Sequence, residues 1–166
     1  FLSTKHEFNG TFLKVKQDIR ALVENLELYE NNQRAFMRHL GEVIHYLADY
    51  FTFPHNTIYP GNLKDHCVYE GEMKLYLRQY LLDGRARAEQ KAPMKLASLE
   101  QLYAFIQKTH DEYLQMKHSI EEDCRYIVNL CYQVVTTIIE LFTANCHQAA
   151  LAQNDMLSGH LLGGTV

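Results

Sequence analysis

The sequence predicts an all-α protein, an antiparallel four- to five-helix bundle that ends in a long C-terminal helix. Apolar residues recur at alternating intervals of three and four, which is the spacing of one face of an α-helix. No glycine or proline occurs from Met94 to Ser158, and a stretch of that length without helix breakers is typical of long helices. The one weak strand candidate, residues 52–59, contains a proline that disfavours a strand.

The N-terminal part of the chain predicts two helices, at about residues 3–29 and 32–52. The apolar spacing weakens between them at Glu30-Asn31-Asn32-Gln33, and two adjacent asparagines suit a turn. A single helix running through both segments is the alternative.

Proline and glycine residues set the limits of the next elements. Residues 53–62 form a loop, because Pro54, Pro60 and Gly61 cannot share one regular helix. A third helix is expected at residues 63–82, where Asp83-Gly84 ends it. The basic segment 84–95 is a connector.

The C-terminal half begins with capping-box spacing at Ser98–Gln101, and the apolar spacing then stays in phase from Leu99 to Phe142. Unbroken, this helix would be about 65 Å long at 1.5 Å per residue. A second capping-box match, Ser119–Glu122, could mark a break. We expect residues 1–150 to form the bundle and residues 151–166 a tail or a linker to a following domain. A helix that long suggests a homodimer, with a seam of five residues: Cys131, Val134, Val135, Ile138 and Leu141.

Composition excludes several classes of protein. The formal net charge of −4 disfavours nucleic-acid binding, which needs a basic face. No apolar run reaches the ~20 residues of a membrane-spanning helix, so we expect no transmembrane segment. The N-terminus lacks a signal-peptide pattern, and none of the four cysteines forms a CxxC pair. We therefore expect a cytoplasmic protein with reduced cysteines.

Nine histidines are a high number for this length. His66 and His118 each stand four residues before a glutamate, Glu70 and Glu122. At that spacing two side chains share a helical face and can bind one metal ion.

The positions of several histidines and acids resemble the hemerythrin-like family. The similar features are His6, the phrase YLADYFTFPHNTIYPGNL, Asp65-His66, and His118 with Glu121-Glu122. The resemblance implies a four-helix bundle with a non-haem di-iron centre. The sequence departs from it at the family's second-helix His-x-x-x-Glu pair, because Tyr59 follows His55 at that spacing. His110 lies on the apolar face, whereas His118 lies nearly opposite and is expected to face solvent. The candidate ligands for iron or another transition metal are His6, His66, Glu70, His110, His118 and Glu122.

The C-terminal segment Leu151–Gly159 resembles the entry of a GGDEF domain, A-x-x-D-x-L-T-G, with Ala152, Asp155, Leu157 and Gly159 in matching places. This resemblance implies a helical sensory input domain that precedes a cyclic-di-GMP signalling domain. No phosphate-binding loop or nucleophile elbow is present. We therefore expect a non-catalytic bundle that binds a ligand or partner and relays the signal through its C-terminal helix. The alternatives are a hemerythrin-like iron-binding bundle and, because residues 133–152 resemble the last BAR helix, a membrane-associating scaffold.

Overall fold

The computed structural model describes residues 6–162, and these form seven α-helices and one short 3-10 helix with no strand. The prediction of an all-α fold with a long C-terminal helix is therefore confirmed. The elements are α1 (Phe8–Glu24), α2 (Leu26–Tyr29), α3 (Gln33–Tyr50), η1 (Phe53–His55), α4 (Leu63–Leu82), α5 (Arg85–Ala88), α6 (Leu99–Leu114) and α7 (Ile120–Leu162).

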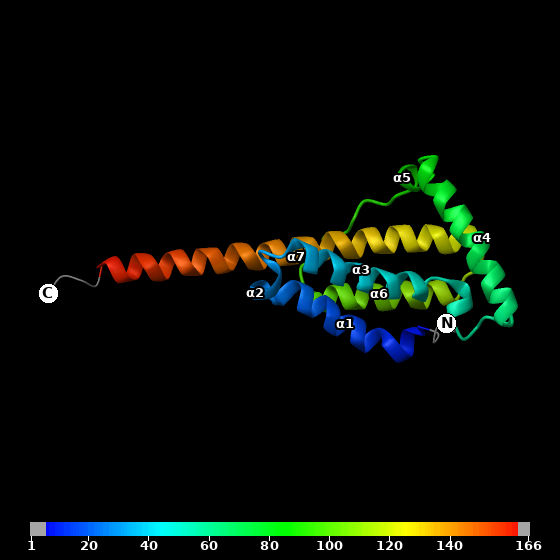
Figure 1. The fold of residues 1–166 in the computed structure, drawn as a ribbon, viewed down its shortest axis with the longest axis horizontal. Helices are drawn as coiled ribbons and strands as arrows, with labels where there is room; N and C mark the ends of the chain where they lie inside the picture. Colours follow the sequence, from blue (N-terminus) through cyan, green and yellow to red (C-terminus); the bar gives the residue numbers. More distant parts are fainter. Residues whose placement is uncertain (1–5, 163–166) are drawn as a thin grey trace.

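Four long helices build the bundle. Helices α1, α3, α6 and the first half of α7 run lengthwise beside one another, and α4 crosses one end of them (Figure 1). Their apolar faces meet in one core, and burying each large aliphatic side chain contributes about 2 kcal/mol. The fully buried aliphatic residues of this core are Val15, Ile19, Leu22, Val43, Leu47, Leu102, Ile106, Leu130, Val134 and Ile138.

Asparagine side chains cap the two helices that follow α1, which are α2 and α3. The side chain of Asn32 accepts the backbone N–H of Ala35 and so caps α3, as the predicted turn requires. Asn25 caps α2 in the same way through Leu28 and adds a second break, which we did not predict. The first two helices are therefore separate, and the single-helix alternative is wrong.

Helix α4 has the bounds predicted for the third helix. Asn62 and Asp65 form a complete capping box at its start, and Asp83 caps its end. Gly84 follows with φ of 80°, a left-handed conformation that glycine adopts without strain. Beyond α5, the connector lies along α7, where Gln133 bonds to both backbone groups of Met94.

Residues 115–119 form a non-helical connector between α6 and α7, so the expectation of one helix continuing to Phe142 is wrong. The hydroxyl of Ser119 accepts the backbone N–H of Glu122, which is the capping bond of the alternative with a break. The apolar residues of α6 and α7 nevertheless pack in the same core.

The prediction of a dimer seam on α7 is wrong, because the seam residues lie inside the bundle. Val134 and Ile138 are 0% exposed, and the other three seam residues pack partly against the same core. The apolar face of α7 that we assigned to a second subunit packs in the core that it shares with α1, α3 and α6 of its own chain. The homodimer itself stays a prediction.

The C-terminal part of α7 projects past the bundle (Figure 1). The helix continues through the expected domain limit at residue 151 to Leu162, and residues 163–166 lie outside the described part of the chain. By length and composition alone, Ile120–Ser158 could cross a membrane, although 33% of its most apolar window is buried within the bundle. The central helix of a globular bundle meets the same criteria.

Candidate metal centre

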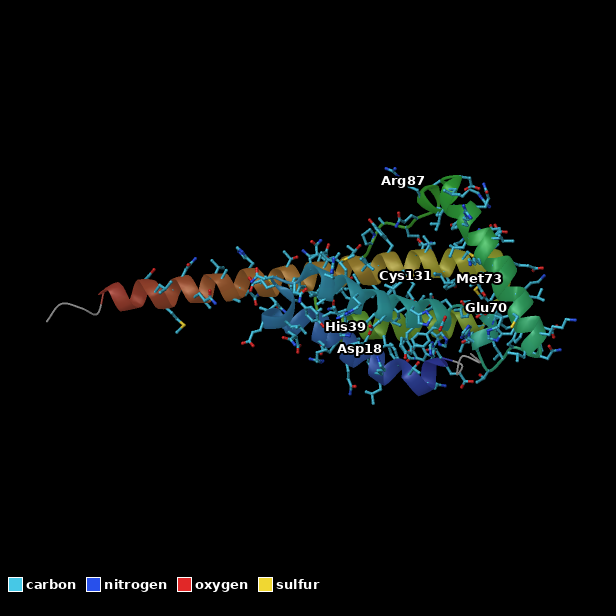
Figure 2. All side chains as sticks on the ribbon, viewed as in Figure 1. Asp18, His39, Glu70, Met73, Arg87 and Cys131 are labelled. Atoms are coloured by element: carbon cyan, nitrogen blue, oxygen red, sulfur yellow. The ribbon has the colours of Figure 1, made fainter. Side chains whose placement is uncertain are left out.

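Two groups of histidine and acidic side chains could each hold a metal ion. His6, His45 and Asp49 form the first group, and His55, His66 and Glu70 form the second. Within each group the candidate ligand atoms lie within 4.8 Å of one another. Figure 2 shows Glu70 on α4 at the end of the bundle that this helix crosses.

The first group, defined as site 1, is built on α3. His45 and Asp49 are four residues apart, so both side chains project from one face of that helix. The segment before α1 adds His6, whose Nδ1 lies 2.7 Å from Asp49 Oδ2, while His45 Nε2 lies 3.6 Å from the same oxygen. The His45 side chain is 61% exposed, so solvent reaches site 1 from this side.

The second group, defined as site 2, joins α4 to η1. His66 and Glu70 stand on one face in the first turns of α4, and His66 Nε2 lies 2.9 Å from Glu70 Oε1. His55 approaches the same oxygen through Nε2 at 2.8 Å. Burial tends to raise the pKa of Glu70, but the hydrogen bonds to the two imidazoles outweigh it and lower this pKa below its ordinary value. Site 2 therefore holds a carboxylate between two nitrogen ligands.

His55 links the two sites. Its Nδ1 lies 3.9 Å from Asp49 Oδ2 of site 1, while its Nε2 belongs to site 2. The ring is buried, and Nδ1 has no hydrogen-bond partner among the described residues. A buried ring nitrogen without a hydrogen-bond partner beside a carboxylate is compatible with metal binding, since a bound ion would satisfy it. The donor set of imidazole nitrogens and carboxylate oxygens suits zinc and related transition metals.

The structure brings three of the six predicted ligands into these sites. His66 and Glu70 lie together in site 2, and His6 lies in site 1. The phrase YLADYFTFPHNTIYPGNL supplies Asp49 and His55, and His45 directly precedes it.

The other three predicted ligands lie in neither site. His110 is buried with its ring stacked on Phe8 at 4.1 Å, and burial lowers its pKa to about 4. His118 lies in the connector before α7, not on a helix, so the phase argument for a solvent-facing ring does not apply. It stacks on Phe53 at 4.3 Å, and burial lowers its pKa. Glu122 forms an ion pair with Arg125.

Sequence reasoning missed three ligand candidates. The pair His45-x-x-x-Asp49 has the spacing that singled out His66 and Glu70, so the same rule, extended to aspartate, would have found it. His55 has no helical partner, because it stands on a short 3-10 helix after Thr52. Only the fold places it between the two sites.

A comparison with models of protein families gives a match. The family model described as zinc dependent phospholipase C matches residues 1–120, which include all six residues of sites 1 and 2. None of the curated proteins and none of the solved structures matches this chain.

The match corrects the functional predictions. A phospholipase C family is a family of enzymes, so the predictions of a non-catalytic signal relay and of a GGDEF-associated input domain are wrong. The hemerythrin-like and BAR-like alternatives are not supported either. A transition metal remains, as expected, but a family defined by zinc gives no support to non-haem iron.

Proposed function

Because the chain belongs to the zinc-dependent phospholipase C family, we propose that it is a zinc-dependent hydrolase of phosphodiester bonds in phospholipids. One observation carries the proposal. Six potential ligands from four separate segments converge on two adjoining sites, and the residues that the family model matches contain all of them.

Each ligand has a distinct place in the proposed centre. His6, His45 and Asp49 would hold one zinc ion, and His55, His66 and Glu70 would hold a second. Asp49 and His55 stand where the two sites meet. With three protein ligands each, both sites keep a coordination position open for water or substrate, as catalytic zinc sites do.

Bound zinc would supply Lewis acidity toward a phosphoryl oxygen and lower the pKa of a nearby water. In the reaction, the oxygen of water forms a bond to phosphorus and the bond from phosphorus to the glycerol oxygen breaks. The glycerol oxygen leaves with a proton, which gives a diacylglycerol and a phosphorylated headgroup.

The surroundings of site 1 are suited to a phosphate group. A groove beside His45 is lined by two cationic side chains, Lys14 and Arg38, together with Glu42 and Tyr46. An anionic phosphodiester entering this groove would meet two cations, partly offset by the Glu42 carboxylate, next to the exposed imidazole. The Glu70 side chain of site 2 is 43% exposed, so both sites can be approached from solvent.

The test is zinc stoichiometry, measured together with hydrolysis of phosphatidylcholine vesicles. We expect two zinc ions per chain after dialysis, one for each site, and release of the phosphorylated headgroup that stops with a chelator. The His66→Ala variant should lose one zinc ion and the hydrolysis.

His147→Ala is the matched control, because His147 is an exposed histidine on α7 and belongs to neither site. It should keep both zinc ions and full activity. Equal zinc content in wild type and His66→Ala, or hydrolysis unaffected by the chelator, would rule the proposal out.

A further inference from the structure

The turn that carries His55 has few hydrogen bonds of its own to hold its conformation. Helix η1 has only three residues, and Thr52 before it makes no side-chain capping bond. The imidazole of His55 must nevertheless reach Glu70 at 2.8 Å with one nitrogen and face Asp49 with the other. Some other part of the chain must therefore hold η1 in place.

The missing cap comes from the first turn of α7, 70 residues further along the chain. Asp123 Oδ2 accepts the backbone N–H of Phe53, the first amide of η1, at 2.8 Å. The opening N–H groups of a helix have no partner within it, so this carboxylate acts as an N-cap supplied by another element.

Two tyrosines fix the carboxylate itself. Tyr69 donates its hydroxyl to Asp123 Oδ2 at 2.8 Å, and Tyr113 donates to Oδ1 at 2.7 Å. Tyr69 directly precedes Glu70 on α4, and Tyr113 lies near the end of α6. One side chain thus ties η1 to the helix that carries the rest of site 2.

The carboxylate is 0% exposed, and its partners are one amide and two hydroxyls. Burial raises the pKa of Asp123 to about 6, although these three hydrogen bonds oppose the rise. Burying an acid among neutral partners is unfavourable compared with an apolar side chain of the same volume. Packing alone therefore gives no reason for an acid here.

We infer that Asp123 is a positioning residue of the metal centre, which caps η1 from α7 and thereby aligns His55 between sites 1 and 2. This inference rests on the proposed zinc-dependent function. It also extends beyond it, because Asp123 lies outside the residues that the family model matches.

The far end of the turn is held independently. Asn56 donates through Nδ2 to the carbonyl oxygens of Tyr50 and Thr52, and its Oδ1 lies 3.1 Å from His110 Nε2. Removing the Asp123 cap should therefore release only the start of η1, so His55 shifts while the bundle stays folded.

The main experiment compares Asp123→Leu with Asp123→Asn in zinc binding. Leucine has similar volume but no acceptor, whereas asparagine keeps an oxygen for Phe53. Loss of a residue that orients a metal ligand typically weakens metal binding by roughly 10- to 100-fold. We expect a weakening of this size in Asp123→Leu for one zinc ion of the two. Asp123→Asn should remain within a few-fold of wild type.

Two further variants serve as controls. Gln133→Leu removes a different buried polar side chain of α7 and should keep both zinc ions. Should Asp123→Leu lose its helical circular dichroism, Asp123→Glu replaces it. Glutamate keeps the charge but moves the acceptor, so it should bind the second zinc less tightly than Asp123→Asn. Equal zinc affinities in Asp123→Glu and Asp123→Asn would overturn the inference.

A measurement without metal separates this inference from the proposed function. In the chelator-treated protein, nitrogen NMR of the imidazoles should show His55 Nε2 hydrogen-bonded in wild type. In Asp123→Leu this signal should move toward that of the exposed His147. An unchanged His55 signal contradicts the positioning role whether or not zinc binds, whereas a wild-type chain without zinc contradicts only the proposed function.

Discussion

Acid should destabilise this protein through His110, and the effect can be isolated with one substitution. The imidazole is 4% exposed and stacks on Phe8, and burial lowers its pKa from 6.5 to about 4. The unfolded chain therefore binds a proton at pH values where the folded chain does not. Because stability rises with pH wherever the unfolded state binds more protons, His110 contributes fully above pH 6.5, and its contribution is lost as pH falls toward 4.

The magnitude follows from the separation of the two pKa values, about 2.5 pH units. Each unit corresponds to about 1.4 kcal/mol, so the complete transition is worth about 3 kcal/mol. Between pH 7 and pH 4.5 most of the transition is crossed, which gives a loss of about 2 kcal/mol in the free energy of unfolding.

The assay is urea denaturation of wild type and His110→Gln at both pH values, with a chelator present. Glutamine can still donate to Asn56, which His110 contacts at 3.1 Å, but it does not titrate. Titration of the remaining groups, including Asp123, cancels in the difference between the two proteins. We expect wild type to lose about 2 kcal/mol relative to the variant on acidification. A difference that stays constant with pH would show that His110 is not kept neutral by burial.

Two further predictions concern α7. Ile138→Lys should destabilise the bundle by roughly 4 kcal/mol or more, because the Ile138 side chain is 0% exposed and a lysine there would bury an unpaired charge. The neighbouring variant Ile139→Lys, at a position 45% exposed, should change stability by less than about 0.5 kcal/mol. Comparable thermal midpoints for the two variants would contradict the burial of Ile138 in the core. A chain truncated after Leu151 should keep the thermal midpoint of the full protein, because the described side chains beyond Leu151 are exposed. A chain truncated after Glu140 loses the hydrogen bond from Asn145 to Val23 and should have a lower thermal midpoint. A lower midpoint for the first truncation would mean that the projecting helix contacts the bundle.

The limits of α4 were predictable because they depend on local chemistry. The Asn62 cap and the left-handed Gly84 act within a few residues of themselves, so α4 has the predicted bounds. The apolar spacing was equally reliable for the core, but it could not tell which chain covers the buried face. A stripe containing Val134 and Ile138 looks the same whether a partner subunit or α1 of the same chain packs on it.

The metal centre was predictable only where two ligands share one helix. His66 and Glu70 satisfy that condition, and so do His45 and Asp49, although the search for a glutamate four residues after a histidine does not find the second pair. His6 and His55 come from segments outside the α-helices, where no periodic rule applies. His118 and Glu122 show the opposite error, because they have the predicted spacing but their side chains do not meet. His118 stacks on Phe53, and Glu122 pairs with Arg125.

The arrangement explains why the second half of the chain matters to a site that it does not ligate. All six ligand candidates lie before residue 71, yet they stand on α3, α4 and two short segments with little mutual support. Helix α7 contacts α1, α3 and α4, and its first turn contributes the carboxylate that holds η1. The family model ends at residue 120, where α7 begins. A chain cut there would keep every ligand but lose both the helix that covers the core and the cap on η1. Part of the ligand geometry is therefore encoded outside the part of the chain that carries the ligands.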